Sequence, residues 1–167
     1  MKIEYSEVLP DDAKKVVEYI NIVANQTTNL TFGSDDCRLN EIQEMELIQE
    51  INNDFNSIMI AAKDKDQIVG MVSLKGNSKK RLKHHANLGI TVLKDYWNLG
   101  IGTNLMAAAI GYAVETGLEI IDLEVVTDND AAIALYEKFG FEVIGKYENF
   151  IKIDDYYLDV YLMNLYL

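Results

Sequence analysis

The stretch that decides the fold is YWNLGIGTNLM, residues 96–106. Gly100 and Gly102 are followed by an apolar, alanine-rich run, which predicts a helix over residues 102–116 that ends at Gly117. Glycine has no Cβ atom, so the backbone can turn tightly here and approach a ligand closely. Successive N–H groups at the start of a helix bind anions. The stretch therefore indicates either an anion-binding loop or a plain tight turn, and alone it does not choose between them.

Two nucleotide-binding patterns fit this stretch poorly. The dinucleotide fingerprint G-x-G-x-x-G needs a third glycine where the chain has Leu105. Asp128 stands about where a ribose-binding acid would lie, which is the one feature in favour of that fingerprint. The triphosphate-binding loop requires Gly-Lys-Ser/Thr, whereas Gly102 is followed by Thr-Asn. A nucleotide-dependent oxidoreductase is therefore disfavoured.

Length and composition predict a single soluble domain over residues 1–167. The chain is 49% hydrophobic and 25% charged, as expected of a globular protein. Its one cysteine, Cys37, excludes an intramolecular disulfide. Because no signal-like segment or long apolar run occurs, we expect a cytoplasmic protein with no membrane partner. The net charge of −12 disfavours nucleic acid as a partner and suits cationic amines.

The order of hydrophobic segments predicts an α/β domain. A strand-helix-strand unit requires the strands at 87–93 and 119–126 to pair in parallel, so the sheet is expected to be mixed. Asn40 and Gln43 form a capping box that starts a helix. The apolar stripe predicted to face inward on this helix is Ile42, Met45, Ile48 and Ile51. Further strands are predicted at 3–8, 57–62, 68–74, from 141 onward and at 159–165, with helices after Pro10 and over 130–139.

A second stretch, TDNDAAIALYEKFGFEVIG at residues 127–145, favours the anion-binding interpretation. Asn129 is suited to cap the helix that follows. The helical spacing places Asn129 and Tyr136 on one face together with Ala132 and Ile133. A functional tyrosine or a core aromatic residue would both satisfy this pattern.

Together these two stretches, with IVGMVSL at 68–74, resemble the GNAT superfamily of N-acetyltransferases over nearly the whole chain. The family loop usually reads [QR]-x-x-G-x-[GA], and residues 97–102 fit it except that Trp97 replaces Gln or Arg. The Tyr-Trp form is similar to a bacterial branch of ribosomal-protein and small-amine acetyltransferases. The resemblance implies an α/β (α+β) GNAT fold, a mixed central β-sheet with a splayed parallel strand pair, flanked by helices.

The resemblance also implies a donor and a set of contacts. Acetyl-CoA would supply the acetyl group for direct attack by a primary amine in a ternary complex, and no metal is expected. The pyrophosphate would contact the loop residues Asn98, Leu99, Gly100, Ile101, Gly102 and Thr103. The pantetheine arm would lie along Ile90 and Val92 and contact Asn129 and Tyr136. Tyr136 would also act as the general acid, since tyrosine is protonated at neutral pH.

The acceptor side is less well specified. Relatives often have a glutamate where this chain has Asn87, and this departure leaves the general base open. Glu124 on the neighbouring strand is one candidate, acting through water, and His85 is another, although its basic surroundings favour a solvated side chain. An enzyme of this kind can also work without a dedicated base. Phe32 and Tyr157 are candidates for acceptor contacts, and the acceptor is either a small-molecule amine or a protein amine. The apolar end of the chain suggests a homodimer. The alternative function is a non-catalytic acyl-CoA-binding module with the same fold.

Overall fold

The computed structural model describes residues 2–33, 36 and 39–167, so Cys37 lies outside the described residues. The strands are β1 Ile3–Glu7, β2 Ile58–Asp64, β3 Gln67–Gly76, β4 His85–Val92, β5 Ile120–Val126, β6 Glu142–Ile153 and β7 Tyr156–Tyr166. The α-helices are α1 Ala13–Val23, α2 Glu41–Asn53, α3 Ile101–Thr116 and α4 Asp130–Lys138. Short 3₁₀ helices are η1 Pro10–Asp12, η2 Lys80–Leu82 and η3 Lys94–Tyr96.

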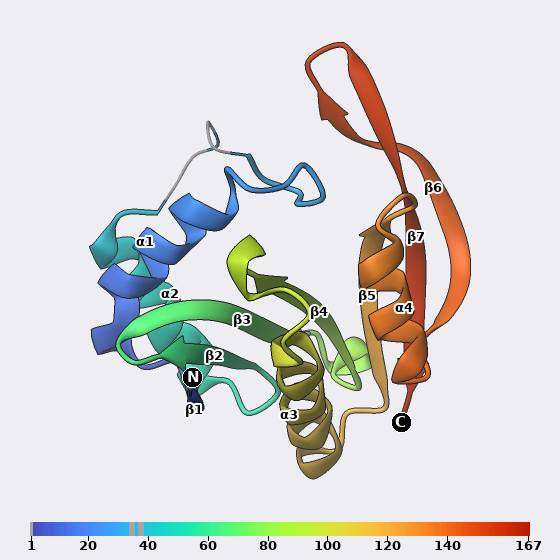
Figure 1. Ribbon diagram of the computed structural model, residues 1–167. Coiled ribbons are helices and arrows are strands. Elements are labelled where there is room, and N and C mark those ends of the chain that lie inside the picture. The colour runs from blue at the N-terminus through green and yellow to red at the C-terminus, as the bar shows by residue number, and fades with distance from the viewer. Residues whose placement is uncertain (1, 34–35, 37–38) are drawn as a thin grey trace.

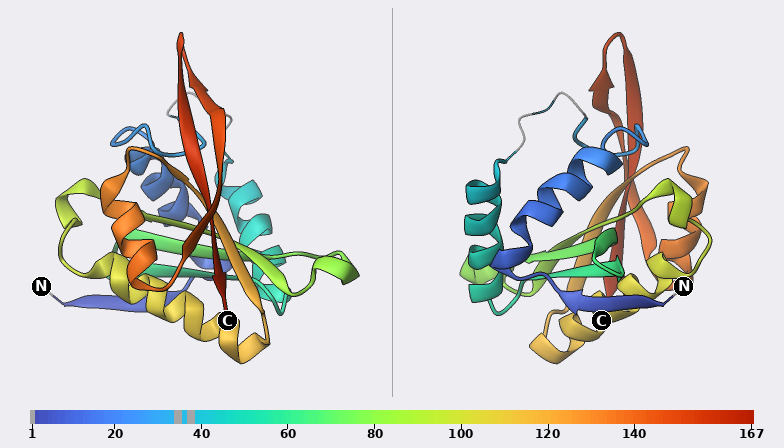
Figure 2. Two further views of the ribbon diagram at one scale, coloured as in Figure 1. Left: turned by 90° about the vertical axis from the view of Figure 1, so that its right-hand side faces the viewer. Right: turned by 60° about the vertical axis from the view of Figure 1, so that its left-hand side comes forward.

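The strands form one seven-stranded sheet in the order β1-β2-β3-β4-β5-β7-β6. Helices α1 and α2 cover one face, and α3 and α4 cover the other (Figure 1 and Figure 2). The α1 face is marked by a hydrogen bond of 2.8 Å between the hydroxyls of Tyr19 in α1 and Thr91 in β4. The α3 face is marked by Gly70 of β3, which lies against α3. Because successive side chains of a strand point to opposite faces, these two contacts show on which face of the sheet each side chain of β4 lies.

The parallel pairing between β4 and β5 is short. His85–Asn87 pair with Ile120–Asp122, and beyond them the described residues of the two strands do not pair with one another. β4 stays paired with β3 up to Val92, and β5 stays paired with β7 up to Val126. The two halves of the sheet are thus intact while the strands between them part, as the ribbon in Figure 1 shows. The predicted mixed sheet with a splayed parallel pair is confirmed.

Helix α3 lies directly against β3. A Cβ atom on Gly70 would stand 3.1 Å from Ile101 Cγ2 and 3.2 Å from Leu105 Cδ1, so the glycine lets the helix approach the sheet. Leu105 is fully buried in this contact, which gives a packing reason for a leucine where the dinucleotide fingerprint has glycine. Gly117 ends α3 in the left-handed conformation, with φ at 77°, as predicted.

The predicted start of α2 is confirmed, but its predicted buried face is partly wrong. Asn40 Oδ1 accepts a hydrogen bond from Gln43 N–H and Gln43 Oε1 accepts one from Asn40 N–H, each at 3.0 Å. Ile42 and Met45 are exposed, at 65% and 37%, while Glu44 is buried. A stripe at positions 44, 48 and 51 satisfies the helical period as well as the predicted stripe does. Burial raises the pKa of the Glu44 carboxyl.

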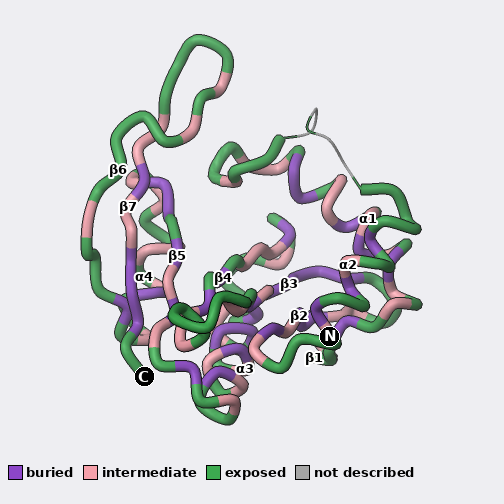
Figure 3. Tube along the Cα trace, turned by 180° about the vertical axis from the view of Figure 1, so that it is seen from behind, coloured by how far each residue is buried: buried purple, intermediate pink, exposed green. Residues whose placement is uncertain are grey.

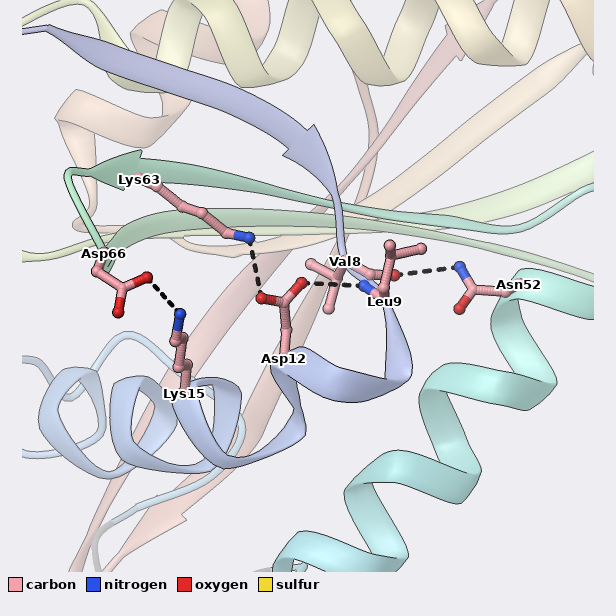
Figure 4. A network of polar contacts seen from close by, with 7 residues as sticks. All are labelled: Val8, Leu9, Asp12, Lys15, Asn52, Lys63 and Asp66. Carbon is pink, nitrogen blue, oxygen red and sulfur yellow. Dashed lines mark hydrogen bonds and ion pairs between the residues drawn. The ribbon is translucent and has the colours of Figure 1, made fainter.

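Polar contacts tie the start of α1 to the sheet and to α2 (Figure 4). Asp12 accepts a hydrogen bond from Leu9 N–H at 3.1 Å and forms an ion pair with Lys63 of β2 at 3.0 Å. Asn52 of α2 donates a hydrogen bond to the Val8 carbonyl at 3.1 Å. Partial burial would raise the pKa of Asp12, but the hydrogen bonds from Lys63 and Leu9 outweigh it and lower that pKa below its usual value.

Strands β6 and β7 form a long hairpin that rises above the rest of the molecule (Figure 1). Its register shifts between Tyr147 and Ile151, so β6 bulges there. Asp159 of β7 holds the bulge, because its carboxylate accepts a hydrogen bond from Asn149 N–H at 2.8 Å and pairs with Lys146 at 2.7 Å. Figure 3 shows that much of this hairpin is exposed, in contrast to the buried middle of the sheet.

The end of the chain lies in β7, an inner strand between β5 and β6. Leu165 is buried within the chain, whereas Tyr166 and Leu167 are exposed. The expected homodimer therefore stays a prediction that rests on these two exposed side chains. Within the described part of the chain, every helix is too short or too polar to span a membrane.

The Asp12–Lys63 pair predicts a pH-dependent contribution to stability. Both side chains are mostly buried, with 15% of Asp12 and 18% of Lys63 exposed. Asp12→Asn should lower the free energy of unfolding at pH 7 by about 1.5–3 kcal/mol, the range for hydrogen bonds to charged groups. Because the pKa of Asp12 is lowered by folding, this contribution is complete above its unfolded pKa of about 3.9 and is lost as the pH falls through the folded value.

Urea denaturation of both proteins between pH 7 and pH 3 measures this difference. The matched control is Asp66→Asn, which breaks the ion pair of Asp66 with Lys15. Asp66 is 90% exposed, so its loss should change the free energy of unfolding much less. If the difference in free energy of unfolding between wild type and Asp12→Asn did not decrease toward pH 3, the ion pair would not be its cause.

Candidate active site

The glycine loop has the backbone geometry of an anion-binding site. Asn98 and Gly100 adopt the left-handed conformation, with φ at 60° and 78°, and α3 begins at Ile101. The first helical hydrogen bond runs from Asn104 N–H to the Gly100 carbonyl at 3.1 Å. The N–H groups of the preceding helical residues therefore have no helical acceptor and point out of the helix start. Together with the helix dipole they form a place for a phosphate or carboxylate.

The two glycines of the loop serve different purposes. A Cβ atom on Gly100 would meet no atom within 4 Å, so Gly100 is needed for its left-handed φ. A Cβ atom on Gly102 would stand 3.2 Å from Leu135 Cδ2 of α4. Gly102 thus lets the start of α3 lie close to α4. The helix carrying Tyr136 and the anion-binding helix start are therefore held side by side.

The parted strands leave one edge of β4 unpaired next to this loop. Leu93 N–H donates a hydrogen bond to the Val69 carbonyl of β3 at 2.9 Å, so the polar groups of residue 93 point toward β3. Backbone direction alternates along a strand, so the N–H and C=O groups of Ile90 and Val92 point the other way, into the gap. The Val92 carbonyl accepts a hydrogen bond of 2.7 Å from the indole N–H of Trp97. Sequence reasoning does not anticipate this bond.

Helix α4 carries the predicted acid. Asn129 caps the helix, with its Oδ1 atom 3.4 Å from Ala132 N–H, so the predicted capping role is confirmed. Tyr136 is only 6% exposed, and its ring lies 5.8 Å from that of Phe141. Burial raises the pKa of Tyr136 to about 12. Among the described residues its hydroxyl has no hydrogen-bond partner, which leaves it available to a ligand.

Three polar side chains lie on the α1 face of the sheet where β4 and β5 part. Asn87 Nδ2 donates to Asp122 Oδ1 at 2.8 Å and lies 3.3 Å from Glu124 Oε2. Glu124 alternates with the buried residues Leu123 and Val125, which face the opposite side. The structure therefore brings the predicted base to the splay. Asp122 is not singled out by the sequence analysis, although its spacing of two residues from Glu124 on a strand places both carboxylates on one face.

The two predicted acceptor contacts lie in separate places. Phe32 borders an apolar hollow against α1 that is also lined by Val17, Ile20 and Ala24, and none of its lining residues belongs to the β6–β7 hairpin. Tyr157 is exposed on β7, with Lys152 Nζ 5.6 Å from its ring centroid. Each therefore stays a separate candidate for acceptor contact.

Comparisons with known proteins agree with this geometry. The sequence profile of the acetyltransferase (GNAT) family matches residues 24–141. L-amino acid N-acetyltransferase AaaT of Escherichia coli strain K12 is 32% identical over 107 residues, which make up 63% of this chain and 65%, just under two thirds, of that protein. The crystal structure of an acetyltransferase of the GNAT family from Streptococcus pneumoniae has a TM-score of 0.95 at 30% identity and covers 99% of both chains.

A more distant structure shares the fold. The phosphinothricin acetyltransferase of Sinorhizobium meliloti in complex with AcCoA has a TM-score of 0.87 at 15% identity, covering 100% of this chain and 89% of that one. The family profile spans well over half of the present chain, and the Streptococcus pneumoniae structure matches it from end to end. The predicted family is therefore confirmed, and the chain belongs to the GNAT family of acetyltransferases.

Proposed function

We propose that the protein transfers the acetyl group of acetyl-CoA to an amine by direct attack while both substrates are bound. The observation that carries this proposal is the parting of β4 and β5 beside the free N–H groups at the start of α3. The name of the Escherichia coli relative and the complex of the Sinorhizobium meliloti relative with AcCoA support an amine acceptor and this donor.

The chain's own residues fit the two parts of the donor. The pyrophosphate suits the backbone N–H groups of residues 98–103, with the Thr103 hydroxyl in the first turn. That segment contains no lysine or arginine, so backbone donors and the helix dipole must meet the phosphate charge. The pantetheine amides suit the edge of β4 that faces the gap, as an added strand would, at the backbone groups of Ile90 and at the N–H of Val92, whose carbonyl already accepts from Trp97. The side-chain amide of Asn129 lies at the adjoining start of α4.

The reaction requires two proton transfers on opposite sides of the splay. The amine nitrogen attacks the thioester carbonyl, a C–N bond forms and the C–S bond breaks. The proton lost by nitrogen goes to Glu124 on the α1 face, directly or through water. The departing thiolate takes the phenolic proton of Tyr136 on the α4 face, and exchange with solvent restores both groups. The opposite faces of the sheet on which the two side chains lie support this division of roles.

The raised pKa of Tyr136 limits how it can act. A pKa of about 12 keeps the phenol protonated at every physiological pH. An ordinary thiol has a pKa of about 8.5, so full proton transfer from this phenol to a solvated thiolate would be uphill. The burial that raises the pKa of the tyrosine also disfavours a bare thiolate beside it. We therefore propose that Tyr136 first hydrogen-bonds to the sulfur as negative charge develops and completes the transfer as the bond breaks.

The acceptor is proposed to be a cationic amine, as either a small molecule or a protein amine. Asp122 and Glu124 place two carboxylates around Asn87 at the exit of the splay on the α1 face. Carboxylates attract an ammonium group before it loses its proton for attack. We propose that Asp122 holds the approaching ammonium group, which gives its first proton to water, and that Glu124 takes the second proton as the nitrogen attacks, with Asn87 fixing the spacing between them. Phe32 and Tyr157 are proposed as more distant contacts of the acceptor.

The anion-binding role of the loop predicts a charge effect on donor affinity. Asn98→Asp preserves side-chain size, and aspartate tolerates the left-handed backbone that Asn98 adopts. The added negative charge beside the pyrophosphate should weaken acetyl-CoA binding about tenfold or more, measured by calorimetry. The matched control is Asn149→Asp, which adds the same charge at another left-handed residue, in the hairpin. Equal affinities of the two variants would contradict the placement of the pyrophosphate.

The acid role of Tyr136 predicts a selective loss of turnover. Tyr136→Phe removes only the hydroxyl, for which the described residues provide no hydrogen-bond partner, so folding and donor affinity should be nearly unchanged. The turnover number with a verified amine should fall about 10²-fold or more. Steady-state kinetics, calorimetry with acetyl-CoA and a melting curve measure the three quantities. Unchanged turnover would show that Tyr136 is only a core aromatic residue, and binding without any turnover by wild type would favour the non-catalytic module.

The two carboxylates on the α1 face predict different kinetic losses. Glu124→Gln should lower the turnover number about 10²-fold, because the amine loses its proton acceptor. Asp122→Asn should mainly raise the KM for the amine, because it removes a charge that holds the ammonium group. Glu115→Gln, on the exposed side of α3, serves as the charge-matched control and should change neither constant. If Glu124→Gln raised only the KM for the amine and left the turnover number unchanged, Glu124 would not be the base.

A further inference from the structure

Trp97 links the two parts of the proposed donor site through one hydrogen bond. Its indole N–H donates to the carbonyl of Val92, the last residue of β4, at 2.7 Å. The indole is 47% exposed, so burial of a large apolar ring does not account for its position. Trp97 immediately precedes the anion-binding segment 98–103, and the Val92 carbonyl lies on the unpaired edge that faces the gap. This hydrogen bond therefore joins the loop to the edge of β4.

Within the described part of the chain, no other side-chain hydrogen bond joins this loop to the β4 edge. The segment before the loop has its own anchors, since Gln26 Oε1 accepts from Lys94 N–H at 2.8 Å and the Tyr96 hydroxyl donates to Asp64 at 3.1 Å. Gln26 lies three residues past the end of α1 and Asp64 is the last residue of β2, so neither bond involves the edge of β4 that faces the gap. Among residues 97–103, the hydrogen bonds of the described structure give only Trp97 a side-chain contact with β4. Backbone bonds at Leu93, Tyr96 and Trp97 shape the turn, and the Trp97 side chain adds a direct link between the loop and this edge.

The residue types at this position share one chemical property. The family loop usually begins with Gln or Arg, and this chain has Trp97 there. The three side chains differ in size, shape and charge, but each carries an N–H group at its ε nitrogen. A donor at that position is what the bond to the Val92 carbonyl requires. Tryptophan therefore preserves the donor while it departs from the usual sequence.

We infer that Trp97 is a positioning residue, whose ε N–H group fixes the phosphate-binding loop at a set offset from the free edge of β4. The inference rests on the proposed function, in which one acetyl-CoA molecule contacts both the loop and the edge. A ligand that spans two sites benefits only when their separation matches its own length. The bond should therefore contribute to binding of the whole donor and not to binding of a fragment that contacts the loop alone.

The experiment compares wild type, Trp97→Phe and Trp97→Gln with two ligands by calorimetry. Phenylalanine keeps an aromatic ring without an N–H group, and glutamine restores an ε N–H donor. The ligands are acetyl-CoA and adenosine 3′-phosphate 5′-diphosphate, which carries the pyrophosphate but lacks the pantetheine arm. Trp97→Phe should bind acetyl-CoA about fivefold more weakly, the equilibrium effect of one neutral hydrogen bond. Its affinity for the fragment should change less than about twofold, and Trp97→Gln should approach wild type with both ligands.

Three results would overturn the inference. Wild-type affinity of Trp97→Phe for acetyl-CoA would show that the bond does not matter. Equal losses for the whole donor and the fragment would show that the bond merely shapes the loop. A glutamine variant as weak as the phenylalanine variant would show that the ε donor is not the required property. Melting curves confirm that all variants fold.

The bond itself can be tested without a ligand. Trp97 is the single tryptophan of the chain, so the protein gives one indole N–H resonance in a nitrogen-15 spectrum. Slow exchange of this proton with solvent should accompany the bond to Val92, and rapid exchange would contradict it. If wild type fails to bind acetyl-CoA, the proposed function is wrong. Tight binding by both wild type and Trp97→Phe would remove only the positioning role.

Discussion

The early parting of β4 and β5 is the constraint on which the rest of the site depends. A strand that loses its neighbour leaves backbone N–H and C=O groups unpaired, which is costly unless water or a ligand bonds to them. The sheet tolerates the gap because β3 stays paired with β4 to its end and β7 does the same for β5. The carbonyl of Asp159 in β7 even accepts a hydrogen bond from Thr127, one residue past β5, at 3.0 Å. Each strand is thus held from its outer side.

The same gap separates two electrostatic environments. On the α4 side, burial raises the pKa of Tyr136 and removes competing partners from its hydroxyl. On the α1 side, Asn87 donates hydrogen bonds to both Asp122 and Glu124, and Glu124 is exposed to solvent. If β4 and β5 were paired along their whole length, the sheet would separate Tyr136 from the three polar side chains on the opposite face. Because the strands part, a thin molecule lying between them can meet a buried hydroxyl on one side and an exposed carboxylate on the other.

Local sequence signals were enough to predict much of the fold and to select the glycine loop and Asn129 as parts of the candidate site. The capping box at Asn40, the C-terminal glycine of α3 and the strand-helix-strand order depend on nearest neighbours, so they could be predicted from the chain alone. The buried face of α2 could not be predicted in this way, because both stripes fit the helical period. Only the packing of α2 against α1 and the sheet decides that Glu44 is buried and Met45 is not.

The missed parts of the site are long-range contacts. Asn87 and Asp122 meet only when two distant strands pair, and the Trp97 bond depends on how a left-handed turn at Asn98 aims the loop. The hollow at Phe32 and the exposed ring of Tyr157 depend on segments whose relative placement no local pattern specifies.

The bulge in β6 has a further consequence for the behaviour of the protein in a crowded solution. β6 is an edge strand of 12 residues that exposes Val143, Ile144 and Tyr147, which makes it a potential template for strands of other molecules. The register shifts and the left-handed Asn149, which Asp159 holds in place, interrupt that template. A regular edge of this length would invite aggregation, whereas a kinked one offers only short stretches of pairing. Asp159 therefore interrupts the exposed edge of the sheet through the bulge that it holds in the neighbouring strand.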